Sequence, residues 1–157
     1  MAKQLMNAQD APCTKFAEFF CTIDGRRYSM LNAKDLEATA SVETTDVPRL
    51  GSVINGKKAT GLEIKLKFTV YKVSEMFDEL IEQFKNTGYL PSFECQVTSY
   101  DESTSIGRST KVYKDCVLDG DVLLSKFDAD GELIEQELEC YAQDYESAES
   151  YTNPTYM

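Results

Sequence analysis

The stretch GLEIKLKFTVY, residues 61–71, alternates apolar and polar side chains over its whole length. Successive side chains of a β-strand point to opposite faces, so this alternation places one set against a core and the other toward water. The stretch therefore predicts a long, half-buried β-strand. Its apolar set is Leu62, Ile64, Leu66, Phe68 and Val70, and its polar set is Glu63, Lys65, Lys67, Thr69 and Tyr71.

A helix is predicted directly after this strand, over residues 75–85. Four apolar side chains recur there at helical spacing, and Ser74 stands where a side-chain cap is favourable. Residues 86–88, which end in a glycine, terminate the pattern. The apolar face of this helix consists of Phe77, Leu80, Ile81 and Phe84.

Further alternating segments on both sides predict an antiparallel sheet. Asp24-Gly25 lies between two apolar runs and favours a two-residue hairpin turn. With residues 61–71 the chain has seven to eight predicted strands, so the fold class is mainly β: a β-barrel-like antiparallel sandwich with one flanking α-helix. The other predicted strands cover residues 19–23, 27–31, 36–43, 93–98, 111–118, 122–127 and 133–142.

The segment between two of these strands, residues 44–60, is predicted as a long loop. Structureless loops above about 12–15 residues are uncommon unless they are functional or disordered. This one is apolar and basic, so we expect it to bury its apolar groups either against another copy of the chain or locally on its own domain. The contact candidates are Val47, Pro48, Arg49, Leu50, Val53, Ile54, Lys57 and Lys58.

The chain is predicted to form a single domain over residues 1–157, because no repeat, low-complexity segment or linker interrupts it. Residues 1–16 read as an N-terminal extension. Residues 144–157 read as an extended tail that a partner orders, since they carry no periodic pattern. The tail contributes three candidate contact residues, Tyr145, Tyr151 and Tyr156.

The composition excludes several classes of function. The chain has no histidine, which removes imidazole-based catalysis and the common zinc sites. Its five cysteines form no Cys-x-x-Cys pair, which predicts a reducing compartment. They lie mainly on apolar strand faces, as Cys95 and Cys140 do, and these are predicted to be small core residues. The net charge of −11 argues against tight binding of nucleic acid, and 18 of the 27 acidic residues follow residue 75. We expect a soluble chain without a signal peptide or membrane insertion.

Three motifs with possible chemistry fit structural roles better. GSVINGKK, residues 51–58, lacks the hydroxyl of a phosphate loop and precedes a predicted strand. The aspartates at 119, 121, 128 and 130 match hairpin turns rather than a calcium loop. Glu135, Glu137 and Glu139 fit a solvated strand face better than a glycosidase pair. The sequence therefore predicts no enzyme, no metal site and no cofactor.

The order of these parts resembles the tail tube proteins of contractile phages, in particular those of PBSX-like prophages and of R-type or diffocin-like phage-tail bacteriocins. The resemblance covers residues 17–146. It rests on the early hairpin, AKDLEA at 33–38, the long loop, GLEIKLKFTVYKV at 61–73, the helix, and ELE at 137–139 with QDYE at 143–146.

This resemblance implies a subunit related in fold to the Hcp tubes of type VI secretion. Six copies would form a ring, and rings would stack into the inner tube of a contractile particle, a conduit for DNA, ions or effectors. The implied partners are further copies, a sheath protein, and baseplate and tail-terminator proteins. The implied location is the virion or phage-tail-like particle, after assembly in the bacterial cytoplasm.

By the same resemblance, the polar face of two strands lines the lumen. The net acidic charge of the subunit would keep DNA from adhering to the wall of such a conduit. A type VI or other contractile-injection tube and a small-ligand-binding β-barrel remain alternatives. The predicted lumen residues are Glu37, Thr39, Ser41, Glu43, Glu63, Lys65, Lys67 and Thr69. Glu135, Glu137 and Glu139 join this wall if the last predicted strand faces inward.

Overall fold

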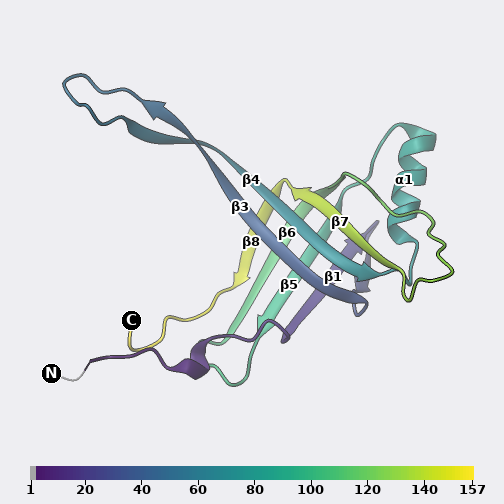
Figure 1. Ribbon diagram of the computed structural model, residues 1–157, viewed down its shortest axis with the longest axis horizontal. Coiled ribbons are helices and arrows are strands. Elements are labelled where there is room, and N and C mark those ends of the chain that lie inside the picture. The colour runs from purple at the N-terminus through teal and green to yellow at the C-terminus, as the bar shows by residue number, and fades with distance from the viewer. Residues whose placement is uncertain (1–2) are drawn as a thin grey trace. The chain divides into compact units, whose positions relative to one another are not determined.

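The computed structural model describes residues 3–157, so Met1 and Ala2 of the expected N-terminal extension lie outside the described residues. The fold is mainly β with one α-helix, which confirms the predicted class (Figure 1). The elements are a short 3₁₀ turn (Ala8–Asp10), β1 (Ala17–Ile23), β2 (Arg26–Ser29), β3 (Ala33–Val47), β4 (Gly56–Tyr71), α1 (Met76–Thr87), β5 (Phe93–Tyr100), β6 (Arg108–Asp119), β7 (Glu135–Ala142) and β8 (Asp144–Glu149).

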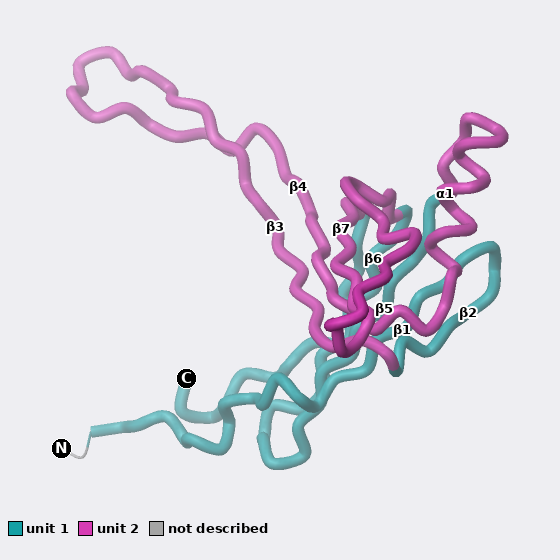
Figure 2. Tube along the Cα trace, turned by 45° about the vertical axis from the view of Figure 1, so that its right-hand side comes forward, with its two compact units in different colours: residues 1–31, 92–115, 144–157 teal, residues 32–91, 116–143 magenta. Residues whose placement is uncertain are grey.

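The strands follow the order β2-β1-β5-β6-β7-β4-β3, and β8 pairs with β6 off this path. The chain divides into two compact units, one of residues 1–31, 92–115 and 144–157 and the other of residues 32–91 and 116–143 (Figure 2). Each unit combines segments that are far apart in sequence, so no linker marks the division. The single-domain organisation over residues 1–157 stays a prediction.

The first unit is built on the predicted N-terminal hairpin. Asp24 and Gly25 both have positive φ, 51° and 76°, as a type I′ turn requires, and they join β1 to β2. β1 also pairs with β5, which places Cys21 directly opposite Cys95. Both thiols are fully buried, with their sulfur atoms 3.7 Å apart, as expected for cysteines in a core.

The core of the second unit lies against one face of β4, which pairs with β3 on one side and β7 on the other. Leu66 and Phe68 of β4 are fully buried, as the alternation predicts. The ring of Phe68 lies 5.9 Å from that of Phe77 of α1, measured between centroids. The predicted helix is thus confirmed as the element that packs on this face.

The C-terminal end of α1 follows the sequence signals, but the N-terminal end differs from the predicted Ser74 cap. The N-cap residue is Glu75, whose side chain makes no capping hydrogen bond, and the Ser74 hydroxyl accepts from the backbone N–H of Met76 at 3.3 Å. Gly88 adopts a left-handed φ of 75°, and its N–H donates to the Phe84 carbonyl at 2.8 Å. This left-handed residue closes the helix, as glycine commonly does.

The predicted loop over residues 44–60 is different in the structure. β3 continues to Val47 and β4 begins at Gly56, so only residues 48–55 connect them. Thr44, Thr45 and Val47 are β-branched residues that favour extended backbone, and Lys57 and Lys58 pair opposite Asp46 and Thr45. The correct description is a long hairpin with a short connection.

The predicted strand at residues 122–127 is also different, because that segment is irregular. Its Leu123 carbonyl accepts from the Lys72 ammonium group rather than from a neighbouring strand. The eighth strand is instead β8, residues 144–149, within the segment predicted to be an extended tail. The tail is therefore ordered by β6 of its own chain over this range.

Candidate functional site

An arm of two strands extends from the second unit. β7 pairs with β4 only from Ile64 to Tyr71, so residues 41–63 form a ribbon of β3 and β4 alone, which we call the arm (Figure 1). All residues of the arm are exposed except Gly56 and Gly61, which are half-buried. An isolated two-stranded hairpin is only marginally stable in water. A surface that packs on the arm would therefore stabilise it.

The tip of the arm, residues 48–55, is ordered by its own hydrogen bonds. The Arg49 guanidinium donates to the Ile54 carbonyl at 3.1 Å, and the Ser52 hydroxyl donates to the same carbonyl at 3.1 Å. Yet Leu50 and Val53 are fully exposed, at 107% and 102%, and Ile54 is 73% exposed. Local packing does not cover these apolar groups in the single chain, and their burial against another copy stays a prediction.

The tip and its base carry positive charge. Arg49, Lys57 and Lys58 fall within residues 47–60, a stretch without a carboxylate. Lys57 forms an ion pair with Asp46 across the hairpin, and Lys58 stands opposite Thr45. The predicted contact residues thus form one exposed, apolar and basic surface.

The eight predicted lumen residues lie together on one face of the β3–β4 hairpin. The register pairs Glu37 with Lys67, Thr39 with Lys65, and Ser41 with Glu63. Residues directly opposite each other in an antiparallel pair share a face. The structure therefore brings this set together, while its role as a lumen wall stays a prediction. The remaining members of the set are Glu43, which pairs with Gly61, and Thr69, which pairs with Asp35.

β7 adds three glutamates to the same face. Glu139 stands opposite Lys67 and Glu137 opposite Thr69. Lys65 forms an ion pair with Glu139 at 3.4 Å, and Lys67 forms one with Glu137 at 2.6 Å. The hydrogen bond and the charge of Glu137 raise the pKa of Lys67.

Carboxylates outnumber lysines on this three-stranded face. Like charge raises the free energy of a polyanion near such a surface, and the effect extends over about 10 Å at 0.1 M salt. The face is therefore suited to border a passage for anions without binding them. Its carboxylates are Asp35, Glu37, Glu43, Glu63, Glu135, Glu137 and Glu139.

The segments around Asp10 and around Thr152 are hydrogen-bonded to the 101–107 loop of the first unit. Ser105 donates to the Asp10 carboxylate from its backbone N–H at 2.9 Å and from its hydroxyl at 2.8 Å. These bonds lower the pKa of Asp10, and burial together with a hydrogen bond to Asp10 raises the pKa of Tyr156. Bonds from Ser103 and from the Cys13 N–H likewise lower the pKa of Asp101.

The three predicted tyrosine contacts are used differently. Tyr145 lies in β8 and stacks on Tyr113 of β6, with centroids 6.2 Å apart. Tyr156 interacts with Asp10 in its own chain, whereas Tyr151 is half-buried. Two of the three tyrosines therefore make contacts within the subunit, whereas the sequence predicted a tail that a partner orders. Their contact with a partner stays a prediction.

The hydrogen bonds accepted by Asp10 and Asp101 predict a stability that is sensitive to acid. Asp10 and Asp101 have lowered pKa values, so their contribution is complete above the ordinary carboxyl value of 3.8 and is lost as the pH falls through the lower folded values. We expect wild type to melt above an Asp10→Asn/Asp101→Asn variant at pH 6, with the difference shrinking as the pH falls below 3.8. Thermal melts across this range measure it. A Glu102→Gln control should follow wild type, and a difference that does not change with pH would contradict the prediction.

Metal sites, membrane spans and the turn motifs of the sequence complete the description of the candidate sites. Over residues 3–157, no group of three or more His, Cys, Asp or Glu side chains is placed to hold a metal ion. Within the same residues, no helix has the length and apolar character needed to cross a membrane. The GSVINGKK motif falls in the arm tip and the start of β4, so it leads into a strand rather than into a helix. The backbone N–H of Gly131 donates to the Asp128 carbonyl at 3.1 Å, as in a turn.

A known protein family matches nearly the whole chain. The family model described as phage tail tube protein matches residues 4–149. The chain belongs to this family. A relative, the phage-like element PBSX protein XkdM of Bacillus subtilis (strain 168), is 26% identical over 148 residues, which cover 94% of this chain and 97% of that protein. The predicted resemblance is confirmed.

Two solved structures show the same fold at low sequence identity. A chain in the cryo-EM structure of the anti-feeding prophage (AFP) baseplate has a TM-score of 0.60 and 11% identity, over 94% of this chain and 97% of that one. A chain of the extended PVC sheath-tube complex, an extracellular contractile injection system, has a TM-score of 0.59 and 10% identity, over 82% and 86% of the two chains.

As a member of the phage tail tube family, the chain is a structural tail tube subunit and part of a phage-tail-like particle. Family and fold together indicate a structural rather than an enzymatic role. The sequence identified the exposed tip and the polar face. It missed β8 and the fixed position of the 120–134 loop, because both depend on partners distant in the chain.

Proposed function

We propose that six copies of this tail tube subunit close into a ring, that the arm of each copy joins one ring to the next, and that the acidic face of β3, β4 and β7 borders the lumen. One observation supports this most strongly. Hydrogen bonds to the Ile54 carbonyl order the backbone of the arm tip, yet Leu50 and Val53 are fully exposed. Burial in a neighbouring copy would remove about 1.5–3 kcal/mol of unfavourable exposure for each such side chain.

Ring closure is supported by the open edge of the sheet. β3 is the last strand in the sheet order and is 15 residues long, so among the described strands only β4 pairs with it and its outer edge is open. Such edges favour pairing with another chain, and a heterologous contact that closes on itself forms a ring. Six copies agree with the family resemblance and with the AFP baseplate relative, whose structure is six-fold symmetrised.

The proposed partners follow from the assemblies that contain relatives of the fold. These are an AFP baseplate, a PVC sheath-tube complex and a PVC sheath/tube terminator. We accordingly assign a sheath protein as the neighbour along the tube, and baseplate and terminator proteins as the neighbours at its ends. The acidic face lets DNA, ions or effectors pass without adhering.

Cryo-EM of the purified chain tests the ring and the lumen together. The expected map contains stacked rings of six subunits with Glu37 and Lys67 on the inner wall. Mass photometry at low concentration should detect the hexamer as an assembly unit. A chain that remains monomeric at high concentration, or a map with the α1 side turned inward, would contradict the proposal.

A further inference from the structure

The loop between β6 and β7, residues 120–134, exposes apolar side chains on the second unit. We call it the acidic loop. Phe127 is 95% exposed and Leu133 is 69% exposed. A cavity of about 450 Å³ opens among Phe127, Leu133, Ile134 and the acidic residues Asp128 and Glu132. The loop therefore offers an apolar recess with an acidic margin.

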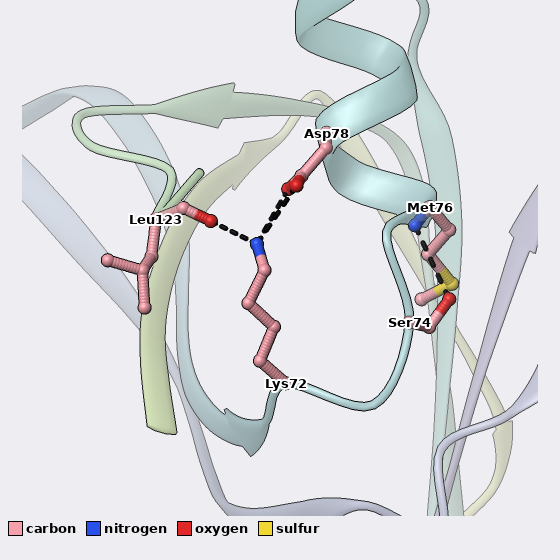
Figure 3. A network of polar contacts seen from close by, with 5 residues as sticks. All are labelled: Lys72, Ser74, Met76, Asp78 and Leu123. Carbon is pink, nitrogen blue, oxygen red and sulfur yellow. Dashed lines mark hydrogen bonds and ion pairs between the residues drawn. The ribbon is translucent and has the colours of Figure 1, made fainter. Parts of the chain in front are cut away.

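The acidic loop is held in place by one residue of the segment that follows β4. The ammonium group of Lys72, whose side chain is 10% exposed, bonds both the Leu123 carbonyl and the Asp78 carboxylate, the latter at 2.9 Å (Figure 3). The Lys72 backbone N–H donates to the Ile134 carbonyl at 2.9 Å. Two points of the loop, Leu123 and Ile134, are thus bonded to Lys72, which also pairs with Asp78 of α1. Because the loop is already ordered, it loses less conformational entropy when a partner docks on it.

The acidic loop and the arm tip are complementary in charge. The tip carries Arg49, Lys57 and Lys58, with no carboxylate between residues 47 and 60. Both surfaces also present apolar side chains without cover in the single chain. Opposite charge around an apolar contact is the arrangement that aligns two protein surfaces and sets their orientation. The loop contains one basic residue, Lys126, and four acidic residues: Asp121, Asp128, Asp130 and Glu132.

We infer that the arm tip of one copy docks on the acidic loop of a second copy, with Leu50 and Val53 against the recess at Phe127. This inference rests on the proposed function and names the surface that receives the arm. Tip and loop belong to the same unit, and Figure 1 shows the tip at the upper left and the loop, in green, at the right. A contact between two different surfaces repeats head to tail, as the stacking of rings requires.

Charge reversal tests the docking. An arm variant, Arg49→Glu/Lys58→Glu, and a loop variant, Asp128→Lys/Asp130→Lys, should each raise the concentration needed for tube formation about tenfold or more, because like charges then face each other. A chain that carries all four substitutions should assemble within about threefold of wild type, because opposite charges face each other again. Sedimentation and negative-stain electron microscopy measure tube yield, and thermal melts confirm that each variant folds.

The matched control is Glu82→Lys/Glu102→Lys, which changes the net charge as the loop variant does but lies in α1 and in the 101–107 loop. It should assemble like wild type. A loop variant that also assembles like wild type would overturn the docking. If the arm variant still fails in that case, the arm stacks rings through another surface and the proposed function stands. If neither variant fails, both are overturned.

A cross-link tests the same contact without altering its charge. In a Cys13→Ser background, Leu50→Cys and Phe127→Cys in one chain should form intermolecular disulfides when assembled tubes are exposed to a mild disulfide oxidant such as oxidised glutathione. Two thiols are then oxidised to one disulfide while oxidised glutathione is reduced to two thiols. A ladder of linked chains on non-reducing gels is expected. Intact tubes without it would overturn the docking even if the charge variants fail to fold.

Discussion

A Phe68→Asp variant is expected to lose the folded state. Phe68 is fully buried at the centre of β4, between β3 and β7 and against Phe77 of α1. Removing a buried phenylalanine side chain costs about 3–5 kcal/mol, and the carboxylate adds the cost of an unpaired buried charge. The sum is comparable to the whole stability of a domain, about 5–15 kcal/mol. Circular dichroism should show no cooperative melt, and the soluble yield should collapse.

Leu62→Asp provides a matched control for this prediction. Leu62 belongs to the same strand and the same apolar set of the alternation, but it lies in the arm and is 59% exposed. Its substitution should leave the melting temperature within a few degrees of wild type, since surface changes usually stay within about 0.5 kcal/mol. A Phe68→Asp chain that melts like wild type would mean that the two faces of β4 are assigned the wrong way round.

The contrast between Phe68 and Leu62 shows how much of the fold the sequence contains. Alternation correctly identified β4 and the side that faces the core, because local periodicity records burial. It did not show where burial ends, since Leu62 continues the pattern with no third strand beside it. The boundary between sheet and arm is set by the end of β7, which is far from β4 in sequence. The continuation of β3 and β4 into residues 44–60 was missed because strand pairing there is not recorded in an alternating pattern of apolar residues.

β8 illustrates the other limit of sequence reasoning. Residues 144–149 have no alternating apolar side chains, and all six are exposed. The strand forms because β6 offers it an edge, with Lys114 paired to Glu146 at 3.0 Å. Conversely, residues 122–127 have a more apolar sequence but no strand partner, and the Leu123 carbonyl is bonded by Lys72. Strand formation in both segments depends on what the rest of the chain presents.

The candidate surfaces were predictable to the degree that they are continuous in sequence. The apolar and basic tip lies within one short segment, so its composition alone made it conspicuous. The acidic face needed the β4–β7 register to add Glu137 and Glu139 beside Lys67. Lys72 carried no signal at all, because a single lysine after a strand is typical of a solvated surface.

Replacement of the arm tip is expected to separate folding from assembly. A chain in which Asn-Gly replaces residues 48–55 joins Val47 to Gly56, which are paired in the hairpin, through a two-residue turn. The tip buries almost nothing within the single chain, so the melting temperature of the subunit should change by only a few degrees. Stacked tubes should be absent from electron micrographs at concentrations where wild type assembles, while folded subunits or single rings remain in sedimentation profiles.

The size of this effect follows from the exposed side chains of the tip. Leu50, Val53 and Ile54 each contribute about 1.5–3 kcal/mol when fully buried, so one arm loses several kcal/mol and each ring loses that amount at every subunit. A Leu50→Ser/Val53→Ser/Ile54→Ser variant keeps the backbone of the tip and should fail to stack in the same way. Leu31→Ser, which removes an equally exposed leucine outside the arm, should stack normally. Tubes of normal length from the tip-less chain would show that rings are joined by another surface, because burial of the tip would then contribute nothing to the assembly.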